Sequence, residues 1–303
     1  MTATMMDGTS LATTLLAETA ERSAQFTETT GRRPALVAVL VGDDPASHTY
    51  VRMKTNRAAE AGIDSRRLDL PQDSTTAELI DVLHRLSVDD EIDGILLQHP
   101  VPAHIDERAA FEAIDPGKDV DGVTRTSFAA MSFGEPGFVS CTPGGIMRLL
   151  DAYGVAVTGR RAVVVGRSPI LGKPVGMLLL GQHATVTYCH SKTENLSDRV
   201  SEADIVVAAV GHAELIRGDW IKPGAVVVDA GYNVGNVGDV EFESAAERAS
   251  LITPVPGGVG PMTIALLLGQ TVDAAIGRAG LAPNSPGTHA PSGRTFRDTD
   301  RIT

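Results

Sequence analysis

The sequence predicts an α/β protein whose parallel sheets are covered by helices on both faces. Short runs of Val, Ile and Leu alternate with helix-length segments along almost the whole chain, the pattern of repeated strand–helix–strand units. The chain has 303 residues, enough for two such domains that each bury a core. Its 31 glycines suit the many strand-to-helix turns of this class, and with 4 % aromatic residues the core must be mainly aliphatic.

In the first half of the chain, the hydrophobic pattern predicts an N-terminal helix followed by three strands and two helices. The N-terminal helix, 10–27, has apolar residues at helical spacing. The strands are short aliphatic runs bounded by turn residues. In chain order these elements are strand 36–41, helix 46–62, strand 66–70, helix 76–86 and strand 94–98.

A cluster of glycine and proline at 134–145 predicts the crossover to a second α/β domain. Its strands are expected at 162–165, 185–189, 205–210 and 225–229, its first helix near Gly172, and a long apolar helix at 260–278. We therefore expect a first domain over 1–140, completed by the helix near 260–280, and a second domain over 141–259. The active site is expected in the cleft between them. Residues 282–303 have few hydrophobic side chains and predict a disordered tail.

Composition excludes several classes of protein. The net charge of −12 argues against a nucleic-acid surface. No run approaches the roughly 18 apolar residues of a spanning helix, and the start lacks the basic residues of a secretion signal, so we expect a soluble cytoplasmic protein without a membrane partner. Cys141 and Cys189 stand in no paired motif and the histidines show no ligand spacing, which predicts reduced cysteines and no metal.

Residues 162–174 predict a phosphate-binding turn between a strand and a helix. The aliphatic run ends at Gly166, and Pro174 suits the first turn of a helix, whose free N–H groups can hold a pyrophosphate. The segment matches neither GxGxxG nor the P-loop pattern, so a purely structural turn is the alternative. Arg167 and Ser168 favour binding, because a guanidinium and a hydroxyl both suit phosphate.

Two features of this segment and the next strand favour NADP over NAD. Arg167 can form a forked contact with a 2′-phosphate. Strand 185–189 is followed by His190, Ser191 and Lys192, and not by the carboxylate that holds the ribose of NAD. The second domain is therefore expected to be a Rossmann-like, doubly wound parallel sheet with NADP as its cofactor.

Segment 47–54 predicts a helix face that carries a hydroxyl, a phenol and an amine. At 100° per residue, Ser47, Tyr50 and Lys54 fall within about 60° of arc. A lysine beside a phenol can be tuned as a proton donor and acceptor, whereas an ordinary solvated face is the alternative.

Three further segments predict ligand contacts. Gln98 ends strand 94–98, where ligands of open parallel sheets lie, although it could also cap a turn. Asp121, in loop 118–122, can hold an N–H-rich heterocycle through two hydrogen bonds. Loop 253–263 has three prolines and three glycines, which make it stiff and let a flat ligand approach its backbone.

Together these segments closely resemble the bifunctional methylenetetrahydrofolate dehydrogenase/methenyltetrahydrofolate cyclohydrolase family (FolD type). The resemblance covers roughly residues 35–275. It implies oxidation of 5,10-methylenetetrahydrofolate by NADP⁺ and hydrolysis of the methenyl product to 10-formyltetrahydrofolate, in one-carbon metabolism and purine biosynthesis. It also suggests a homodimer. The matching segments are 41–54, 93–102, 118–122, 141–144, 164–174, Ser191, 222–233 and 253–263.

The resemblance also implies residue roles. Lys54 would be the general acid/base, on the same helix face as Ser47. Tyr50 would contact the folate, Gln98 would orient Lys54, and Asp121 would hold the pterin edge. The remaining contacts would be Pro256, Gly257, Gly258, Val259 and Gly260 on the folate, and Gly166, Arg167, Ser168, Ser191 and Tyr232 on the dinucleotide.

Some positions depart from the family pattern without removing a proposed catalytic group. His99 and Val101 change the edge of the folate pocket, Pro169 replaces a common Asn, and Tyr232 is larger than the usual Ile or Val. The alternatives are an enzyme that uses NAD⁺ or hydrolyses weakly, a binding protein without turnover, and a shikimate-type dehydrogenase. Intact Lys54 and Asp121 argue against the binding protein, and loop 253–263 has no purpose in a shikimate-type enzyme.

Overall fold

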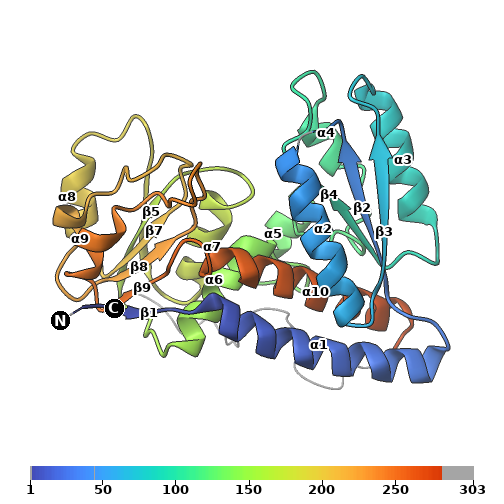
Figure 1. Cartoon of the computed structure of the whole chain (residues 1–303), viewed down its shortest axis with the longest axis horizontal. Coiled ribbons are helices and arrows are strands. Elements are labelled where there is room, and N and C mark those ends of the chain that lie inside the picture. The colour runs from blue at the N-terminus through green and yellow to red at the C-terminus, as the bar shows by residue number, and fades with distance from the viewer. Residues whose placement is uncertain (1, 44, 282–303) are drawn as a thin grey trace.

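The protein consists of two parallel β-sheets with helices on both faces of each. We describe it from a computed structural model that defines residues 2–43 and 45–281, without the side chains of residues 45–50. The three-stranded sheet has the order β3-β2-β4 and the six-stranded sheet the order β1-β9-β8-β7-β5-β6. Figure 1 shows the two sheets at opposite ends of the molecule, so the predicted α/β class with two sheets is confirmed.

Strand β2 (Ala35–Val41) is the centre of the three-stranded sheet, between β3 (Asp64–Leu70) and β4 (Gly94–Leu97). Its side chains alternate between two cores, as the two-residue period of a strand requires. Leu36, Ala38 and Leu40 pack with α2 (Pro45–Glu60), while Val37 and Val39 pack with α3 (Thr76–Val88) and the short α4 (Glu107–Phe111). Both faces are buried, which explains the unbroken aliphatic sequence of β2.

The six-stranded sheet is doubly wound. One face is covered by α6 (Cys141–Ala152) and α7 (Gly172–Gly181), and the other by α8 (Leu196–Ser201), α9 (Phe242–Ala246) and the 3₁₀ turn η1 (Gly218–Trp220). All of its neighbouring strands are parallel. The strands are β1 (Thr4–Met5), β5 (Arg161–Val165), β6 (Thr185–Cys189), β7 (Ile205–Ala208), β8 (Val226–Asp229) and β9 (Leu251–Ile252).

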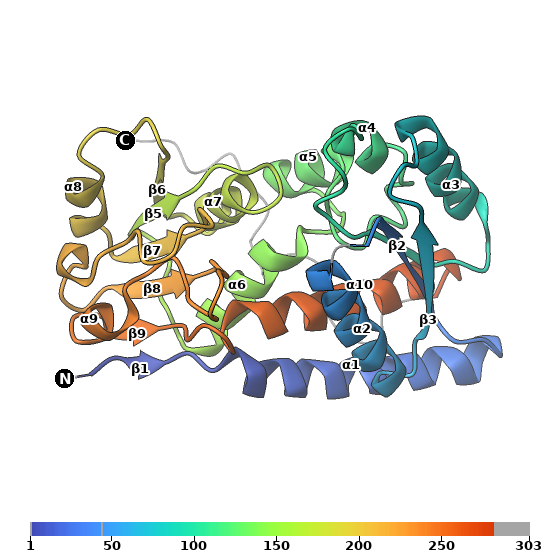
Figure 2. The same ribbon diagram turned by 45° about the horizontal axis from the view of Figure 1, so that its top comes forward.

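Helix α10 (Val259–Arg278) connects the two cores and lies alongside α1 (Gly8–Thr30), as Figures 1 and 2 both show. Met262 and Ala265 belong to a core of the six-stranded sheet, and Leu267 and Val272 to a core of the three-stranded sheet. The helix is long and apolar enough to span a membrane, but 83 % of its most apolar window is buried inside the protein. Burial of this kind is the ordinary state of a core helix.

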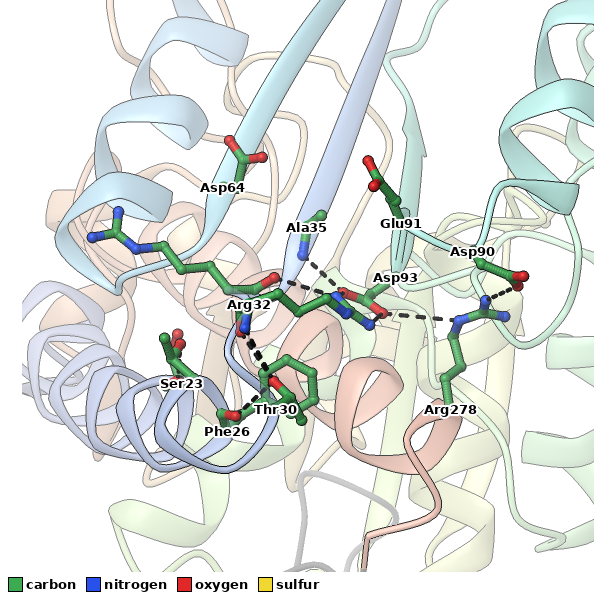
Figure 3. A network of polar contacts seen from close by, with 12 residues as sticks. Ser23, Phe26, Thr30, Arg32, Ala35, Asp64, Asp90, Glu91, Asp93 and Arg278 are labelled. Carbon is green, nitrogen blue, oxygen red and sulfur yellow. Dashed lines mark hydrogen bonds and ion pairs between the residues drawn. The ribbon is translucent and has the colours of Figure 1, made fainter.

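Asp93 anchors the amino end of the three-stranded sheet (Figure 3). Its carboxylate accepts two hydrogen bonds from Arg32, at 2.6 and 2.8 Å, and one from the backbone N–H of Ala35, at 2.9 Å. Arg278 of α10 lies 3.8 Å from the same carboxylate and pairs with Asp90 at 3.2 Å. One buried side chain therefore joins the end of α1, the start of β2 and the last turn of α10.

The predicted elements of the sequence are present, with ends that shift by no more than three residues, and additional elements join them. Strands β1 and β9 have two residues each, too short to show a period, and β1 brings the N-terminus into the six-stranded sheet. The Gly/Pro cluster at 134–145 holds the end of α5 (Arg125–Phe133) and the start of α6. The predicted tail at 282–303 lies outside the described residues.

Candidate functional site

A buried lysine and a glutamine meet at the carboxyl end of the three-stranded sheet. Lys54 lies on α2 and Gln98 directly after β4, and they are 5 % and 8 % exposed. The Lys54 Nζ donates to Gln98 Oε1 at 3.1 Å. The other end of the amide is also held, because Gln98 Nε2 donates to the carbonyl of His99 at 2.8 Å. This second bond orients the amide so that its oxygen faces the lysine.

Burial lowers the pKa of Lys54 from its ordinary value, since an apolar surrounding disfavours the charged amine. Asp121 acts in the opposite direction, because a carboxylate beside the amine favours its protonated form, and Cys141 has a smaller effect in the same direction. Gln98 binds the amine through a neutral carbonyl oxygen and adds no net charge. The Lys54 amine is therefore held in place, and its lowered pKa favours the neutral form, which can accept a proton.

The polar residues of loop 118–122 differ in role: some stabilise the loop, and one is partly exposed. Lys118 is buried and its Nζ donates to the carbonyls of Leu86 and Asp89. Asp119 is also buried and accepts three bonds, from Val123 N, Thr124 N and Ser127 Oγ, while burial raises its pKa to about 6. Asp121 is partly exposed. Of the two carboxylates seen in the sequence, Asp119 therefore holds the loop and Asp121 is open to a ligand.

The structure adds Cys141 to this centre and places Gln270 next to it, although the sequence analysis assigned neither residue to the site. Cys141 begins α6, and its thiol donates to the carbonyl of Val120 at 3.2 Å. Burial and the neighbouring Asp121 raise the pKa of this thiol well above its ordinary value. Gln270 of α10 donates to the carbonyls of Val120 and Val139 at 2.7 and 3.0 Å. An amide side chain inside a mostly apolar helix was the available signal for Gln270.

We call Lys54, Gln98, Asp121 and Cys141 the lysine centre. Ser47 and Tyr50 were predicted to share the face of Lys54, and α2 is helical from Pro45 to Glu60. The side chains of these two residues lie outside the described part of the structure. Their place in the lysine centre therefore stays a prediction.

The turn from β5 to α7 is built so closely that two positions require glycine. A Cβ on Gly166 (φ 131°) would lie 2.1 Å from the carbonyl oxygen of Ala209, and one on Gly172 would lie 2.5 Å from the oxygen of Gly166. Ser168 Oγ accepts from the N–H groups of Leu171 and Gly172 at 3.1 and 3.2 Å. Arg167 is exposed beside it. The two glycines thus let the turn pack tightly against Ala209 at the start of α7, and the Ser168 hydroxyl accepts from two N–H groups there.

Two other predicted dinucleotide contacts follow neighbouring parts of the same sheet edge. Ser191 is exposed two residues after β6, the neighbour of β5. Tyr232 follows β8, is 69 % exposed, and its hydroxyl donates to Asn236 Oδ1 at 2.5 Å. We call Gly166, Arg167, Ser168, Ser191 and Tyr232 the nucleotide edge, since they all follow the carboxyl ends of parallel strands.

Loop 253–258 leads from β9 into α10 with little side-chain cover. The Val255–Pro256 peptide bond is cis. Gly258 cannot carry a Cβ, which would lie 2.6 Å from the carbonyl oxygen of Pro254. Gly257 accepts a hydrogen bond from the N–H of Thr9 at 3.0 Å, which ties the loop to α1. Of the predicted folate contacts in this loop, Gly258 and Val259 are buried, and Pro256 and Gly260 are exposed.

Fold and site together define a class of protein, a two-sheet α/β enzyme with a dinucleotide-type sheet edge and a separate centre around a buried lysine. Among the described residues, no three His, Cys, Asp or Glu side chains are grouped as metal ligands would be. Residues 6–121 match the family model described as tetrahydrofolate dehydrogenase/cyclohydrolase, catalytic domain, and residues 140–279 match the NAD(P)-binding domain of the same family. The chain therefore belongs to the tetrahydrofolate dehydrogenase/cyclohydrolase family.

Individual relatives agree with this assignment. The chain is 70 % identical over 275 residues to bifunctional protein FolD 1 of Salinispora arenicola, covering 91 % of this chain and 99 % of the relative. It matches the crystal structure of the bifunctional enzyme FolD from Campylobacter jejuni with a TM-score of 0.88 and 42 % identity, over 91 % and 99 % of the two chains. The Trypanosoma brucei dehydrogenase-cyclohydrolase, solved with NADP and an inhibitor, matches with a TM-score of 0.89 and 38 % identity, over 93 % and 100 %.

These findings establish the enzyme class. The protein is a tetrahydrofolate dehydrogenase and cyclohydrolase with an NAD(P)-binding domain, which confirms the expectation from the sequence motifs. The alternatives of a binding protein without turnover and of a shikimate-type dehydrogenase are set aside by the family assignment.

Proposed function

We propose that the protein oxidises 5,10-methylenetetrahydrofolate with NADP⁺ and then hydrolyses the methenyl product to 10-formyltetrahydrofolate, with the lysine centre performing the hydrolysis. The observation that carries this proposal is the buried Lys54 amine, held at 3.1 Å by Gln98 and shifted toward its neutral form. Bound NADP⁺ would accept the hydride that leaves the one-carbon bridge. The protein contributes by holding the two ligands in register and excluding water.

In the hydrolytic step, Lys54 acts on water and on the folate nitrogen. The neutral amine accepts a proton as water adds to the cationic methenyl carbon. The resulting ammonium returns that proton to the folate nitrogen as its bond to the carbon breaks, and the hydroxyl of the adduct releases its proton to solvent as the formyl C=O bond forms. Gln98 keeps the amine oriented without stabilising its charged form as a carboxylate would. Asp121, available in its loop, holds the N–H groups of the pterin, with Tyr50 and Ser47 on the Lys54 face of α2.

The preference for NADP is supported at the nucleotide edge. Exposed Arg167 beside the glycine turn offers a forked partner for a 2′-phosphate, and Ser191 offers a hydroxyl. The Trypanosoma brucei relative was solved with NADP. Tyr232 contributes an exposed aromatic face for the adenosine part, and residues 256–260 line the folate side.

The proposal also covers the domain boundaries, the cellular compartment and the oligomeric state. Residues 1–140, with α10, form the folate-binding domain and residues 141–259 the NADP-binding domain, while β1 ties the N-terminus to the second sheet. The ligands bind in the cleft between the domains. The protein acts in the cytoplasm as a homodimer, without nucleic-acid or membrane partners, and its product supplies formyl groups for purine biosynthesis.

Absorbance of the methenyl chromophore tests both reactions in one cuvette. Purified protein with methylenetetrahydrofolate should form the chromophore with NADP⁺ and much less with NAD⁺, and should accelerate the decay of added methenyltetrahydrofolate. Formation without faster decay would contradict the role of the lysine centre. Equal rates with both cofactors would contradict the NADP preference.

A further inference from the structure

Two buried carboxylates at the carboxyl edge of the six-stranded sheet take no part in the chemistry described above. Asp229, the last residue of β8, is 3 % exposed, and Asp239 is 0 % exposed. Together they accept seven hydrogen bonds, all from neutral N–H groups. A carboxylate is costly to bury, and N–H donors in this number are what keep it there.

Asp239 fixes the turn that follows β7. Its Oδ2 accepts from the N–H groups of Val210 and Gly211 at 2.7 and 2.9 Å, and its Oδ1 from the N–H of His212 at 2.8 Å. Three consecutive N–H groups that converge on one carboxylate leave the turn little freedom. Asn233 Nδ2 donates to the same Oδ1 at 3.1 Å, which ties the loop after β8 to the same group.

This turn is the surface on which the glycine turn of the nucleotide edge rests. Ala209 immediately precedes the residues held by Asp239, and its N–H donates to Val165 at 2.8 Å. Its carbonyl oxygen is the atom that leaves no room for a Cβ on Gly166. A displacement of residues 209–212 would therefore be passed to the Gly166 turn by direct contact.

Asp229 extends the same support to the next two loops. Its oxygens accept from Gly231, Asp239 and Val240 at 2.9, 3.0 and 2.9 Å, and its own N–H donates to Thr253 Oγ1 at 2.7 Å. The space is closely filled, because a Cβ on Gly238 would lie 1.9 Å from Asp229 Oδ2. The side chains of Asp229 and Asp239 thus join the loops after β7 and β8, and the Thr253 hydroxyl adds the loop after β9.

We propose that Asp239, supported by Asp229, is a positioning residue for the dinucleotide, which holds the turns after β7 and β8 where the cofactor binds. The proposal rests on the proposed NADP site. The charge of Asp239 and its role in fixing the turns predict opposite effects of a substitution on cofactor binding. A carboxylate near an anionic cofactor repels it, so removal of the charge alone would tighten binding, whereas loss of the fixed turns would weaken it.

Asp239→Asn tests the proposal, because it keeps the shape but turns an acceptor oxygen into an NH₂ group that faces other donors. We expect the KM for NADP⁺ and the Kd for NADPH to rise by about 10- to 100-fold, the loss of hydrogen bonds to a charged group. The cyclohydrolase reaction needs no dinucleotide, so its kcat/KM should stay within about twofold. This split between two activities of one protein is something a general loss of structure would not produce.

Asp204→Asn is the matched control. Asp204 precedes β7 at the opposite edge of the sheet and accepts from Arg161 N at 2.9 Å and Lys222 Nζ at 2.6 Å. Its substitution should leave the KM for NADP⁺ unchanged. NADPH binding to the unmodified protein is measured first, since its absence would overturn the proposed NADP site itself and not only the role of Asp239.

An unchanged or lower KM for NADP⁺ in folded Asp239→Asn, or an equal loss of both activities, would overturn the proposal. If this variant does not fold, Asn233→Ala takes its place, because it removes one of four donors and keeps the carboxylate. A rise of about tenfold in the KM for NADP⁺, the effect of one hydrogen bond to a charged group, is then expected. No rise would count against the proposal.

Discussion

At the scale of single residues, the properties of Lys54 come from its surroundings and not from its own chemistry. Burial lowers its pKa, and the Gln98 oxygen holds it at 3.1 Å. A fully exposed lysine on the same helix would stay protonated near neutral pH and could not accept a proton from water. The residue type was visible in the sequence, but its enclosure was not.

Replacing Lys54 with Met should remove the amine while keeping a side chain of similar length in the buried position. We expect cyclohydrolase kcat to fall by about 10²- to 10⁴-fold, the usual loss for a general acid/base. Steady-state decay of methenyltetrahydrofolate measures it. Lys222→Met, an exposed lysine at the amino edge of the other sheet, is the control and should retain full hydrolysis. Full hydrolysis by Lys54→Met would remove the assigned role.

The pH dependence of hydrolysis should report the pKa of Lys54. Because the pKa is lowered by burial, the neutral amine forms below the ordinary lysine pKa of 10.5, and kcat/KM should rise with pH and level off below that value. Gln98→Glu places a negative charge beside the amine, favours its protonated form and should move the rise to higher pH. Identical profiles for the two proteins would show that another group controls the rise.

At the scale of elements, Asp93 joins three chain segments at the end of the three-stranded sheet away from Lys54 (Figure 3). Asp93→Asn breaks the fork with Arg32, whose side chain is 36 % exposed and can still reach water. We therefore expect a loss of about 2–3 kcal/mol in the free energy of unfolding, measured by urea denaturation. Activity well below the unfolding midpoint should not change.

Asp64→Asn provides the control for Asp93. Asp64 pairs with Arg66 at 3.0 Å, but both side chains are nearly half exposed, so the pair contributes little. Its loss should change the free energy of unfolding by no more than about 0.5 kcal/mol. If both substitutions cost the same, burial of the Asp93 carboxylate would not be the source of its contribution.

At the scale of the whole molecule, α10 should make the two sheets unfold together. Leu267 of α10 is fully buried in the core of the three-stranded sheet, whereas the single tryptophan, Trp220, packs on the six-stranded sheet. Leu267→Ala should cost about 2–5 kcal/mol and lower the denaturant midpoint recorded by Trp220 fluorescence. Leu180→Ala, at a position 52 % exposed on α7, should leave that midpoint in place.

Two separate transitions would contradict this cooperativity. In that case the circular dichroism signal would show two transitions. Leu267→Ala would lower the denaturant midpoint of one of them, while the midpoint recorded by Trp220 fluorescence would not change. Helix α10 would then contact both cores without coupling the unfolding of the two sheets.

The sequence by itself determined the class of fold and the family of the enzyme. Aliphatic runs such as β2 and β7 show burial of both faces directly, because a strand covered on both sides has few polar positions. Gly166, Gly172 and Gln98 are recognisable because local backbone geometry or a strand end explains them. Lys54 and Asp121 are recognisable from the family motifs, and the structure brings these two residues together.

Only the tertiary structure decided which polar groups are structural and which are available. Asp119 and Asp121 look alike in the sequence, yet three donors enclose the first, whereas the second is partly exposed. Gln270 meets Val120 across 150 residues of sequence, and Asp239 meets Val210 across 29. Such contacts depend on long-range packing, which leaves no period or spacing in the chain, so no local pattern could have predicted them.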